Sequence, residues 1–237
     1  FEKKEIILRD GDSAYIWLHK PSGHGVLSKQ FWPDDEYYKK EYRHEFSSRS
    51  DGNYQNQEEH LKCYKDLNRK QFNQFSSYLQ SSSSILDIGG SFGGVSKHIE
   101  SFGVHNHHII EPNHDDANFL KKFIPKSVIY NNYIENISLP NSFFDIIVSF
   151  EVMEHVINPR YFLQAAYTAL KPGGKINIEV PNHDDVLLTM YEDINYDTFF
   201  YHKAHIHYFT AKSLNDLAGI CQFQKINVES FLIYPLF

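Results

Sequence analysis

The chain is poor in sulfur, which limits the kinds of site it can build. Its 237 residues include only two cysteines, Cys63 and Cys221, far apart in the sequence. They form neither a CxxC metal motif nor a disulfide framework, so we expect a reducing, cytoplasmic compartment. No apolar run approaches the ~18 residues of a membrane span and no signal peptide is visible, so we expect no membrane partner. The first residue is Phe1, which suggests a processed or trimmed chain.

Two further absences narrow the function. The net charge is -7 and no basic patch stands out, so a nucleic-acid partner is disfavoured, and a protein acceptor less firmly. The GxGxxG spacing of a dinucleotide-binding turn is also missing, which argues against a nicotinamide-dependent dehydrogenase. Hydrophobic residues make up 41% of the chain and charged residues 22%, as is ordinary for a globular protein. The aromatic share, 16%, is high and favours a large core.

From residue 85 onward, apolar runs and helical patterns alternate. Such alternation predicts an α/β fold, a doubly wound and mostly parallel sheet with helices on both faces. Strands are expected at 85–88, 106–111, 127–130, 144–150, 175–180 and 224–230. Helices are expected at 95–102, 115–123 and 159–170, and after Thr210 to Gly219. Ligands of such sheets bind at the carboxyl ends of the strands.

Residues 1–80 are predicted to form an accessory segment packed on a domain of residues 81–237. A hairpin is expected around Asp10-Gly11-Asp12-Ser13, and one long helix from Asn56 to about Gln80. The aromatic and charged stretch 31–43 is either a surface segment or a lid. The serine run 81–84 is too short to separate independent domains, so the helix should pack on the following core.

The stretch Ile85–Gly94 is the most informative in the chain. An apolar run ends in Asp87 and a glycine cluster follows, which is a strand, a turn and the start of a helix. An acid before the first glycine would repel pyrophosphate but suits a cationic group such as an ammonium. The next strand ends in Glu111, placed to accept hydrogen bonds from ribose hydroxyls.

Four motifs in this order resemble the class I S-adenosylmethionine-dependent methyltransferases: ILDIGGSFGG (85–94), IIEPN (109–113), FDIIVSFEVMEHVINP (144–159) and ALKPGGKINIEVPN (169–182). The resemblance implies a Rossmann-like fold and transfer of a methyl group from S-adenosyl-L-methionine, with S-adenosyl-L-homocysteine as product. It implies cofactor contacts from Asp87, Gly89, Gly90, Ser91, Gly93, Glu111, Pro112, Asn132, Tyr133, Ser149, Phe150 and Glu151.

Two positions depart from the family pattern. Ser91 stands where glycine is commonest, which is a small change. Tyr133 stands where an Asp commonly receives the adenine amino group, which leaves Asn132 or the backbone to make that contact.

Four of the 14 histidines are candidates for a general base, which a hydroxyl acceptor would need. They are His155, His183, His205 and His207. A metal site is not expected, because His-x-His lacks a clear third ligand beyond a guess at Asp184 or Asp185. The aromatic and acidic segment 187–201 is either a cover over the acceptor site or simple packing.

The acceptor is predicted to be a small molecule. The HxHYFT stretch (205–210) resembles a subset of the family that includes sugar and glycan-pathway methyltransferases, which implies a sugar hydroxyl as acceptor. The first alternative is a phenolic or quinone-precursor hydroxyl. A second alternative, from another class, is a non-catalytic module that binds S-adenosylmethionine without turnover.

Overall fold

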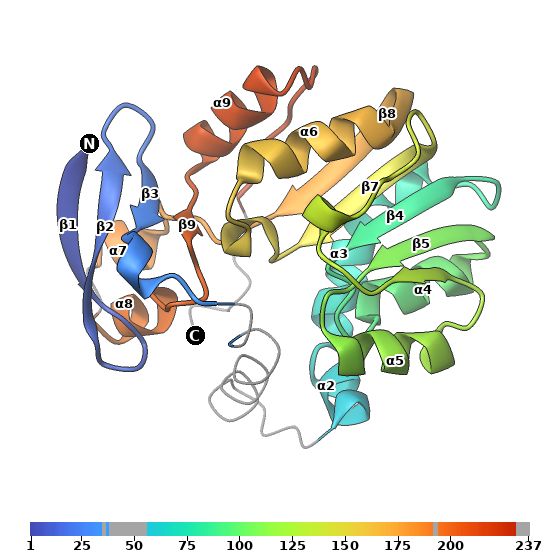
Figure 1. Ribbon diagram of the computed structural model, residues 1–237, viewed down its shortest axis with the longest axis horizontal. Coiled ribbons are helices and arrows are strands. Elements are labelled where there is room, and N and C mark those ends of the chain that lie inside the picture. The colour runs from blue at the N-terminus through green and yellow to red at the C-terminus, as the bar shows by residue number, and fades with distance from the viewer. Residues whose placement is uncertain (35–36, 38–55, 192–193, 231–237) are drawn as a thin grey trace. The chain divides into compact units, whose positions relative to one another are not determined.

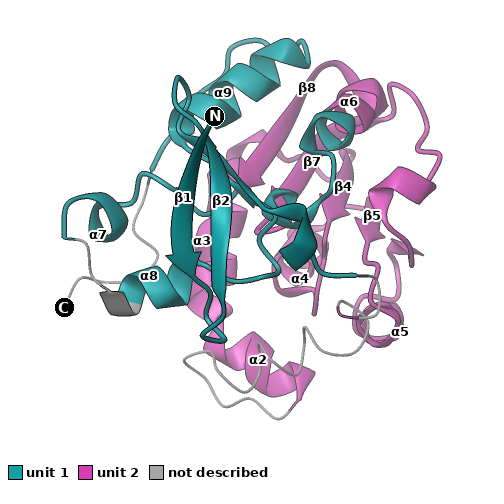
Figure 2. Cartoon of the chain, turned by 60° about the vertical axis from the view of Figure 1, so that its left-hand side comes forward, with its two compact units in different colours: residues 1–34, 153–163, 180–237 teal, residues 35–152, 164–179 magenta. Residues whose placement is uncertain are grey.

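The structure is a computed structural model that describes residues 1–34, 37, 56–191 and 194–230 of the chain (Figure 1). The contacts divide it into two compact units (Figure 2). Unit 1 contains residues 1–34, 153–163 and 180–237, and unit 2 contains residues 35–152 and 164–179. These boundaries differ from the expected division at residue 80, because the first strands group with residues 153–163 and 180–237.

Unit 2 is built on a five-stranded parallel sheet with the order β6-β5-β4-β7-β8. The strands are β4 (Ser84–Ile88), β5 (Asn106–Ile110), β6 (Val128–Tyr130), β7 (Phe144–Phe150) and β8 (Leu170–Glu179). β4 is buried along its whole length, as its continuous apolar run predicts for a parallel strand. The α/β class and the parallel sheet of the prediction are confirmed.

Helices cover this sheet. They are α2 (Gln57–Cys63), α3 (Lys65–Phe75), α4 (Gly94–Phe102), α5 (His114–Phe123) and α6 (Pro159–Ala169), the last belonging to this unit from residue 164. Phe75 of α3 and Ile99 of α4 pack with Ile85 and Val148 of the sheet. Leu120 of α5 packs on Ile109. In Figure 1, α6 lies in front of β7 and β8, whereas α3 and α4 lie behind the sheet.

Unit 1 contains a four-stranded antiparallel sheet with the order β1-β2-β3-β9. Its strands are β1 (Glu2–Ile7), β2 (Ser13–His19), β3 (His24–Leu27) and β9 (His207–Tyr208), and its helices are α7 (Val186–Thr189), α8 (Ile194–Phe200) and α9 (Ala211–Ile220). The predicted hairpin around residues 10–13 is confirmed as β1 and β2. Ile16, Leu27, Phe200 and Tyr208 lie in the apolar core of this unit.

Three expected elements are wrong. The long helix breaks at Tyr64, which has non-helical dihedrals and whose ring stacks on His60 at 4.4 Å. The strand expected at 175–180 is present as β8 but with the wrong start, because β8 begins at Leu170 and its register with β7 shifts between Phe144 and Ile146. Residues 224–230 form no strand. Their backbone joins neither sheet of the described residues, so no neighbouring strand pairs with this segment.

Two expected segments are only partly described. Most of residues 31–43 lie outside the described residues, so the choice between a surface segment and a lid stays open. In the segment 187–201, Leu188, Phe200 and Tyr201 are buried in the core of unit 1, which favours packing over a cover. Among the described residues, no helix is both long and apolar enough to cross a bilayer.

Candidate cofactor site and histidine cluster

The turn between β4 and α4 packs so closely against neighbouring side chains that a Cβ does not fit at its glycines. Gly89 has φ +81°, and a Cβ there would collide with the side chain of Val152. A Cβ on Gly90 would collide with Ile109 in the same way, and Gly93 has φ +79°. Ser91 also lies in the left-handed region, with φ 49°. The sequence therefore supplies small residues where the backbone itself forms the surface of the turn.

Glu111 is held at the carboxyl end of β5 by two backbone donors. Its Oε2 accepts from the Ser91 N–H at 2.8 Å and its Oε1 from the Asn113 N–H at 2.8 Å. Asn131 also donates to the carbonyls of Glu111 and Pro112, at 2.9 and 3.0 Å, which ties this loop to the end of β6. An ionised carboxylate has about four acceptor positions, so it can also accept from a diol such as the ribose hydroxyls.

Asp87 is more buried than we expected for a residue predicted to contact the ammonium group of the cofactor. Its side chain is buried, and its Oδ2 accepts from the Ser96 hydroxyl of α4 at 2.5 Å. Burial raises the pKa of Asp87 to about 6, and the Ser96 hydrogen bond opposes this rise. The same hydroxyl lies 3.2 Å from His107 Nε2. Asp87 therefore joins β4 to α4, and its contact with the cofactor ammonium remains a prediction.

The carboxyl end of β7 presents two polar atoms that lack hydrogen bonds. Ser149 Oγ and Glu151 Oε1 are buried and have no partner among the described residues. Glu151 has φ 54°, a left-handed conformation that is strained for a residue with a Cβ. Burial and the nearby Glu179 raise the pKa of Glu151 to about 8. Phe150 lies between these residues and its ring is 6.2 Å from that of Phe75.

Asn132 and Tyr133 follow β6, as expected. Asn132 is exposed, and its Oδ1 accepts from the Tyr133 N–H at 2.9 Å and from Asn136 Nδ2 at 3.2 Å. This places both residues in the loop that the family uses for the adenine, but the contact itself stays a prediction.

These features of unit 2 fit S-adenosylmethionine. The turn is rich in glycine, Glu111 offers acceptors for a ribose, and Ser149 and Glu151 offer buried polar atoms that have no hydrogen-bond partner among the described residues. In a parallel sheet these strand ends share one edge, which is where ligands bind.

Two of the four candidate histidines meet in unit 1, around a carboxylate that the sequence analysis passed over. Glu154 Oε1 lies 3.6 Å from His155 Nε2 and 3.8 Å from His205 Nε2. His155 Nδ1 donates to the Ala204 carbonyl at 2.7 Å. The side chain of Glu154 is 1% exposed. We call Glu154, His155 and His205 the histidine cluster.

His202 borders the histidine cluster. Its ring centroid lies 3.6 Å from that of His205. Burial, together with the neighbouring imidazoles and Arg9, holds the pKa of both His202 and His205 well below the usual value, so both rings are neutral at pH 7. The spacing of residues in the sequence predicted neither the contact between His202 and His205 nor the position of Glu154 beside His155 and His205. In irregular backbone, side-chain directions do not repeat at a fixed number of residues.

His207 lies apart from the histidine cluster. Its Nδ1 is 3.2 Å from His24 Nε2, and the two rings stack with centroids 5.3 Å apart. Burial lowers the pKa of His24 to about 3 and that of His207 to about 4. The two rings therefore form a neutral pair between β3 and β9.

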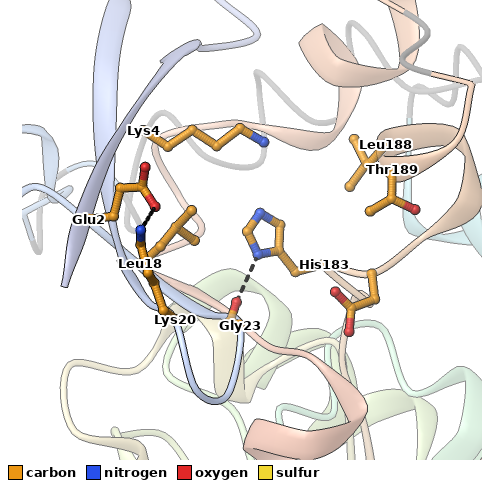
Figure 3. A pocket seen from close by; sticks show the side chains of 9 residues that line it. Glu2, Lys4, Leu18, Lys20, Gly23, His183, Leu188 and Thr189 are labelled. Carbon is orange, nitrogen blue, oxygen red and sulfur yellow. Dashed lines mark hydrogen bonds and ion pairs between the residues drawn. The ribbon is translucent and has the colours of Figure 1, made fainter.

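His183 lines a cavity of unit 1 of about 250 Å³, shown in Figure 3. Its Nδ1 donates to the Gly23 carbonyl at 3.2 Å, and its Nε2 accepts from the Tyr201 hydroxyl at 3.0 Å. Lys4 Nζ in turn donates to that hydroxyl at 3.0 Å. Both nitrogens of His183 are thus occupied, which favours a structural role over that of a base. The cavity is lined by Glu2, Lys4, Leu18, Lys20, Gly23, His183, Asp184, Leu188 and Thr189.

Comparison with known proteins agrees with this geometry. A family model described as a methyltransferase domain matches residues 57–228, and the chain belongs to that family. It is an enzyme that uses S-adenosylmethionine, and its sheet has the Rossmann-like fold of such methyltransferases. No curated protein sequence gives a significant match.

Solved structures share the fold at low sequence identity. A methyltransferase from Archaeoglobus fulgidus is 22% identical, with a TM-score of 0.54 and coverage of 68% of this chain and 70% of its own. A possible histamine N-methyltransferase from Thermotoga maritima is 21% identical, with a TM-score of 0.54 and coverage of 70% and 77%.

A third structure contains the product form of the cofactor. It is phosphoethanolamine N-methyltransferase 2 of Haemonchus contortus, in complex with phosphomonomethylethanolamine and S-adenosylhomocysteine. It is 19% identical, with a TM-score of 0.56 and coverage of 69% of this chain but 38% of its own.

Proposed function

We propose that this enzyme methylates a hydroxyl oxygen of a small acceptor, a sugar or sugar-bearing metabolite. The observation that carries the proposal is the histidine cluster. His155 is the fourth residue after Glu151, so the chain itself keeps it within ~14 Å of the carboxyl end of β7. The cofactor contacts proposed above involve that strand end, and this short connection along the chain supports a role of the cluster in the transfer.

The state of His155 supports this role. Its Nδ1 carries a proton, because the Ala204 carbonyl can only accept, so in the neutral form of the ring Nε2 is the nitrogen that can accept a proton. Bound S-adenosylmethionine supplies a methyl group that is already electrophilic. The chain then has to orient the acceptor and remove the hydroxyl proton. An imidazole lone pair can act on a hydroxyl directly, as a general base, or through a bound cation.

An amine acceptor is the main alternative. Two of the structural relatives are named for N-methylation, one with phosphomonomethylethanolamine bound and one as a possible histamine N-methyltransferase. An amine attacks through its own lone pair once it is neutral, whereas a hydroxyl is a poor nucleophile unless a base removes its proton during the attack. The cluster therefore favours an oxygen acceptor. A phenolic hydroxyl ranks second, since it too has to lose a proton.

The test is a S-adenosylhomocysteine release assay on nucleotide sugars, phenols, phosphoethanolamine and histamine. We expect turnover with a sugar hydroxyl. His155→Gln should lower kcat roughly 10²–10⁴-fold, the range of general acid–base catalysis, while the Kd for S-adenosylhomocysteine stays unchanged. His105→Gln, an exposed histidine of unit 2, is the matched control.

The outcomes separate the alternatives. Turnover confined to the amines would reject the oxygen acceptor. Cofactor binding without turnover on any acceptor of the panel would favour a non-catalytic binding module.

A further inference from the structure

We propose that Glu154, His155 and His205 bind a divalent first-row transition-metal ion, with Zn²⁺ as the reference ion. Each side chain offers one ligand atom, and the three atoms lie within 4.8 Å of one another. One carboxylate and two imidazoles form a ligand set that suits such ions and is not typical of Mg²⁺ or Ca²⁺, which prefer oxygen alone.

Two of the three separations between ligand atoms are close to those of a filled site. An ion about 2.0–2.1 Å from each ligand in tetrahedral geometry holds the ligand atoms roughly 3.4 Å apart. The carboxylate oxygen of Glu154 is already 3.6 Å from one imidazole nitrogen and 3.8 Å from the other. Side-chain shifts of a few tenths of an ångström would complete these two separations.

The proton positions also favour a cation. His155 Nδ1 donates to the Ala204 carbonyl at 2.7 Å, so in the neutral form of the ring Nε2, which lies 3.6 Å from Glu154 Oε1, is the nitrogen that can coordinate an ion. A carbonyl bonded to the far nitrogen is the usual way in which proteins orient a metal-binding histidine.

His205 is also suited to bind an ion. Its side chain is 12% exposed, and no described residue forms a hydrogen bond with its Nδ1, so no described group fixes its tautomer. The ring can therefore adopt the tautomer that has a lone pair on Nε2, the nitrogen 3.8 Å from Glu154 Oε1.

The backbone holds the ligands together across a long loop. Glu154 and His155 lie in the short 3₁₀ helix Met153–His155, and His205 lies just before β9. The Ile206 N–H donates to the Glu154 carbonyl at 2.9 Å, which adds to the bond between His155 and Ala204. These two bonds bring the segments into register, so the site is built largely before an ion arrives.

Three protein ligands leave at least one coordination position for a water molecule or a hydroxyl oxygen of the acceptor. Such coordination lowers the pKa of the bound oxygen and would make the cluster activate the acceptor through the ion rather than as a direct base. This consequence rests on the proposed function, whereas the binding of the ion does not.

The experiment is calorimetric titration of the chelator-treated, dialysed full chain with ZnCl₂, with Co²⁺ absorption as a second reading. We expect one strong site per chain and cobalt bands in the visible range. His205→Gln and Glu154→Gln should each weaken Zn²⁺ binding by roughly 10–100-fold or more. His24→Gln replaces another buried histidine of unit 1, outside the ligand set, and should bind Zn²⁺ like the unmodified chain.

Thermal melting in chelator shows whether each variant is folded. If one variant does not fold, the other variant and the cobalt spectrum of the unmodified chain still decide the question. Absence of a stoichiometric site would overturn the proposal. So would a Zn²⁺ affinity of both ligand variants equal to that of the unmodified chain. A normal Zn²⁺ site with methyl transfer unaffected by chelator would reject the activating role alone, and loss of transfer on chelation would support it.

Discussion

Glu151 and Glu179 lie at the carboxyl ends of the neighbouring strands β7 and β8, and the Glu151 N–H donates to the Glu179 carbonyl at 2.9 Å. The two carboxyl groups differ in the hydrogen-bond donors that they receive. Glu179 accepts from Gln71 Nε2 at 2.7 Å and from Gln74 Nε2 at 2.8 Å, both on α3. Glu151 receives no such donor at Oε1 among the described residues, and its pKa rises to about 8.

This difference predicts a pH-dependent stability. In the absence of cofactor, folded Glu151 keeps its proton up to about pH 8, whereas the unfolded chain releases it near the ordinary pKa of a glutamate, 4.5. The free energy of unfolding should therefore fall as the pH rises between these values. In Glu151→Gln the fall should be smaller, which leaves the variant more stable than the parent at pH 8.5 by an amount on the order of a few kcal/mol.

Urea denaturation of the cofactor-free chain at pH 5 and pH 8.5 measures this difference. Glu5→Gln, on an exposed position of β1, should keep the slope of the parent chain. The same slope in Glu151→Gln would show that Glu151 is ionised at neutral pH in the folded chain.

Glu111 provides a test of the cofactor site. In Glu111→Gln the side chain loses its charge, and one of the two backbone donors, Ser91 or Asn113, then faces an amide nitrogen. Since a hydrogen bond to a charged group is worth ~1.5–3 kcal/mol, the Kd for S-adenosylhomocysteine should rise by roughly 10–150-fold. Calorimetry measures the change, with the exposed Asp115→Asn of α5 as control. An unchanged Kd would remove Glu111 from the ribose contact.

Ser96 is predicted to matter mainly when Asp87 is charged. Ser96→Ala removes the hydroxyl that donates to the buried Asp87 carboxylate at 2.5 Å, which should cost about 1–3 kcal/mol of stability. The loss should be larger at pH 8, where Asp87 is ionised, than at pH 5, below its pKa of about 6. Urea denaturation at both values checks this. Ser101→Ala, exposed on the same helix, controls for the change in helix propensity, and equal losses at both pH values would contradict the expectation.

Tyr201 joins the N-terminal hairpin to the segment after β8. In Tyr201→Phe, Lys4 Nζ loses an acceptor and His183 Nε2 loses a donor, each now 3.0 Å from the hydroxyl. The free energy of unfolding should fall by about 1–2 kcal/mol. Tyr191→Phe is the matched control, because that ring is 70% exposed. Equal stability of the two variants would show that the hydroxyl adds nothing to the fold.

Strands and helices that depend on local pattern were predictable. The strand 144–150 is β7 with the same bounds, because a continuous apolar run between turn residues marks a buried parallel strand. Thr210 caps α9 as its position suggested. The strand expected at 224–230 failed for the opposite reason, since alternation alone does not supply a neighbouring strand. β9, with two residues, is too short to leave a pattern in the sequence.

The candidate site also has parts that the local sequence predicts and parts that it does not. By itself, the sequence from Ile85 to Gly94 determined a strand, a turn of small residues and a helix start, because these depend on burial and backbone conformation of adjacent residues. Only the tertiary structure decided which histidines meet. His155 contacts Ala204 across 49 positions, whereas His207, two residues from His205, pairs with His24 instead. Such contacts depend on how distant segments hydrogen-bond and pack, and no local period encodes them.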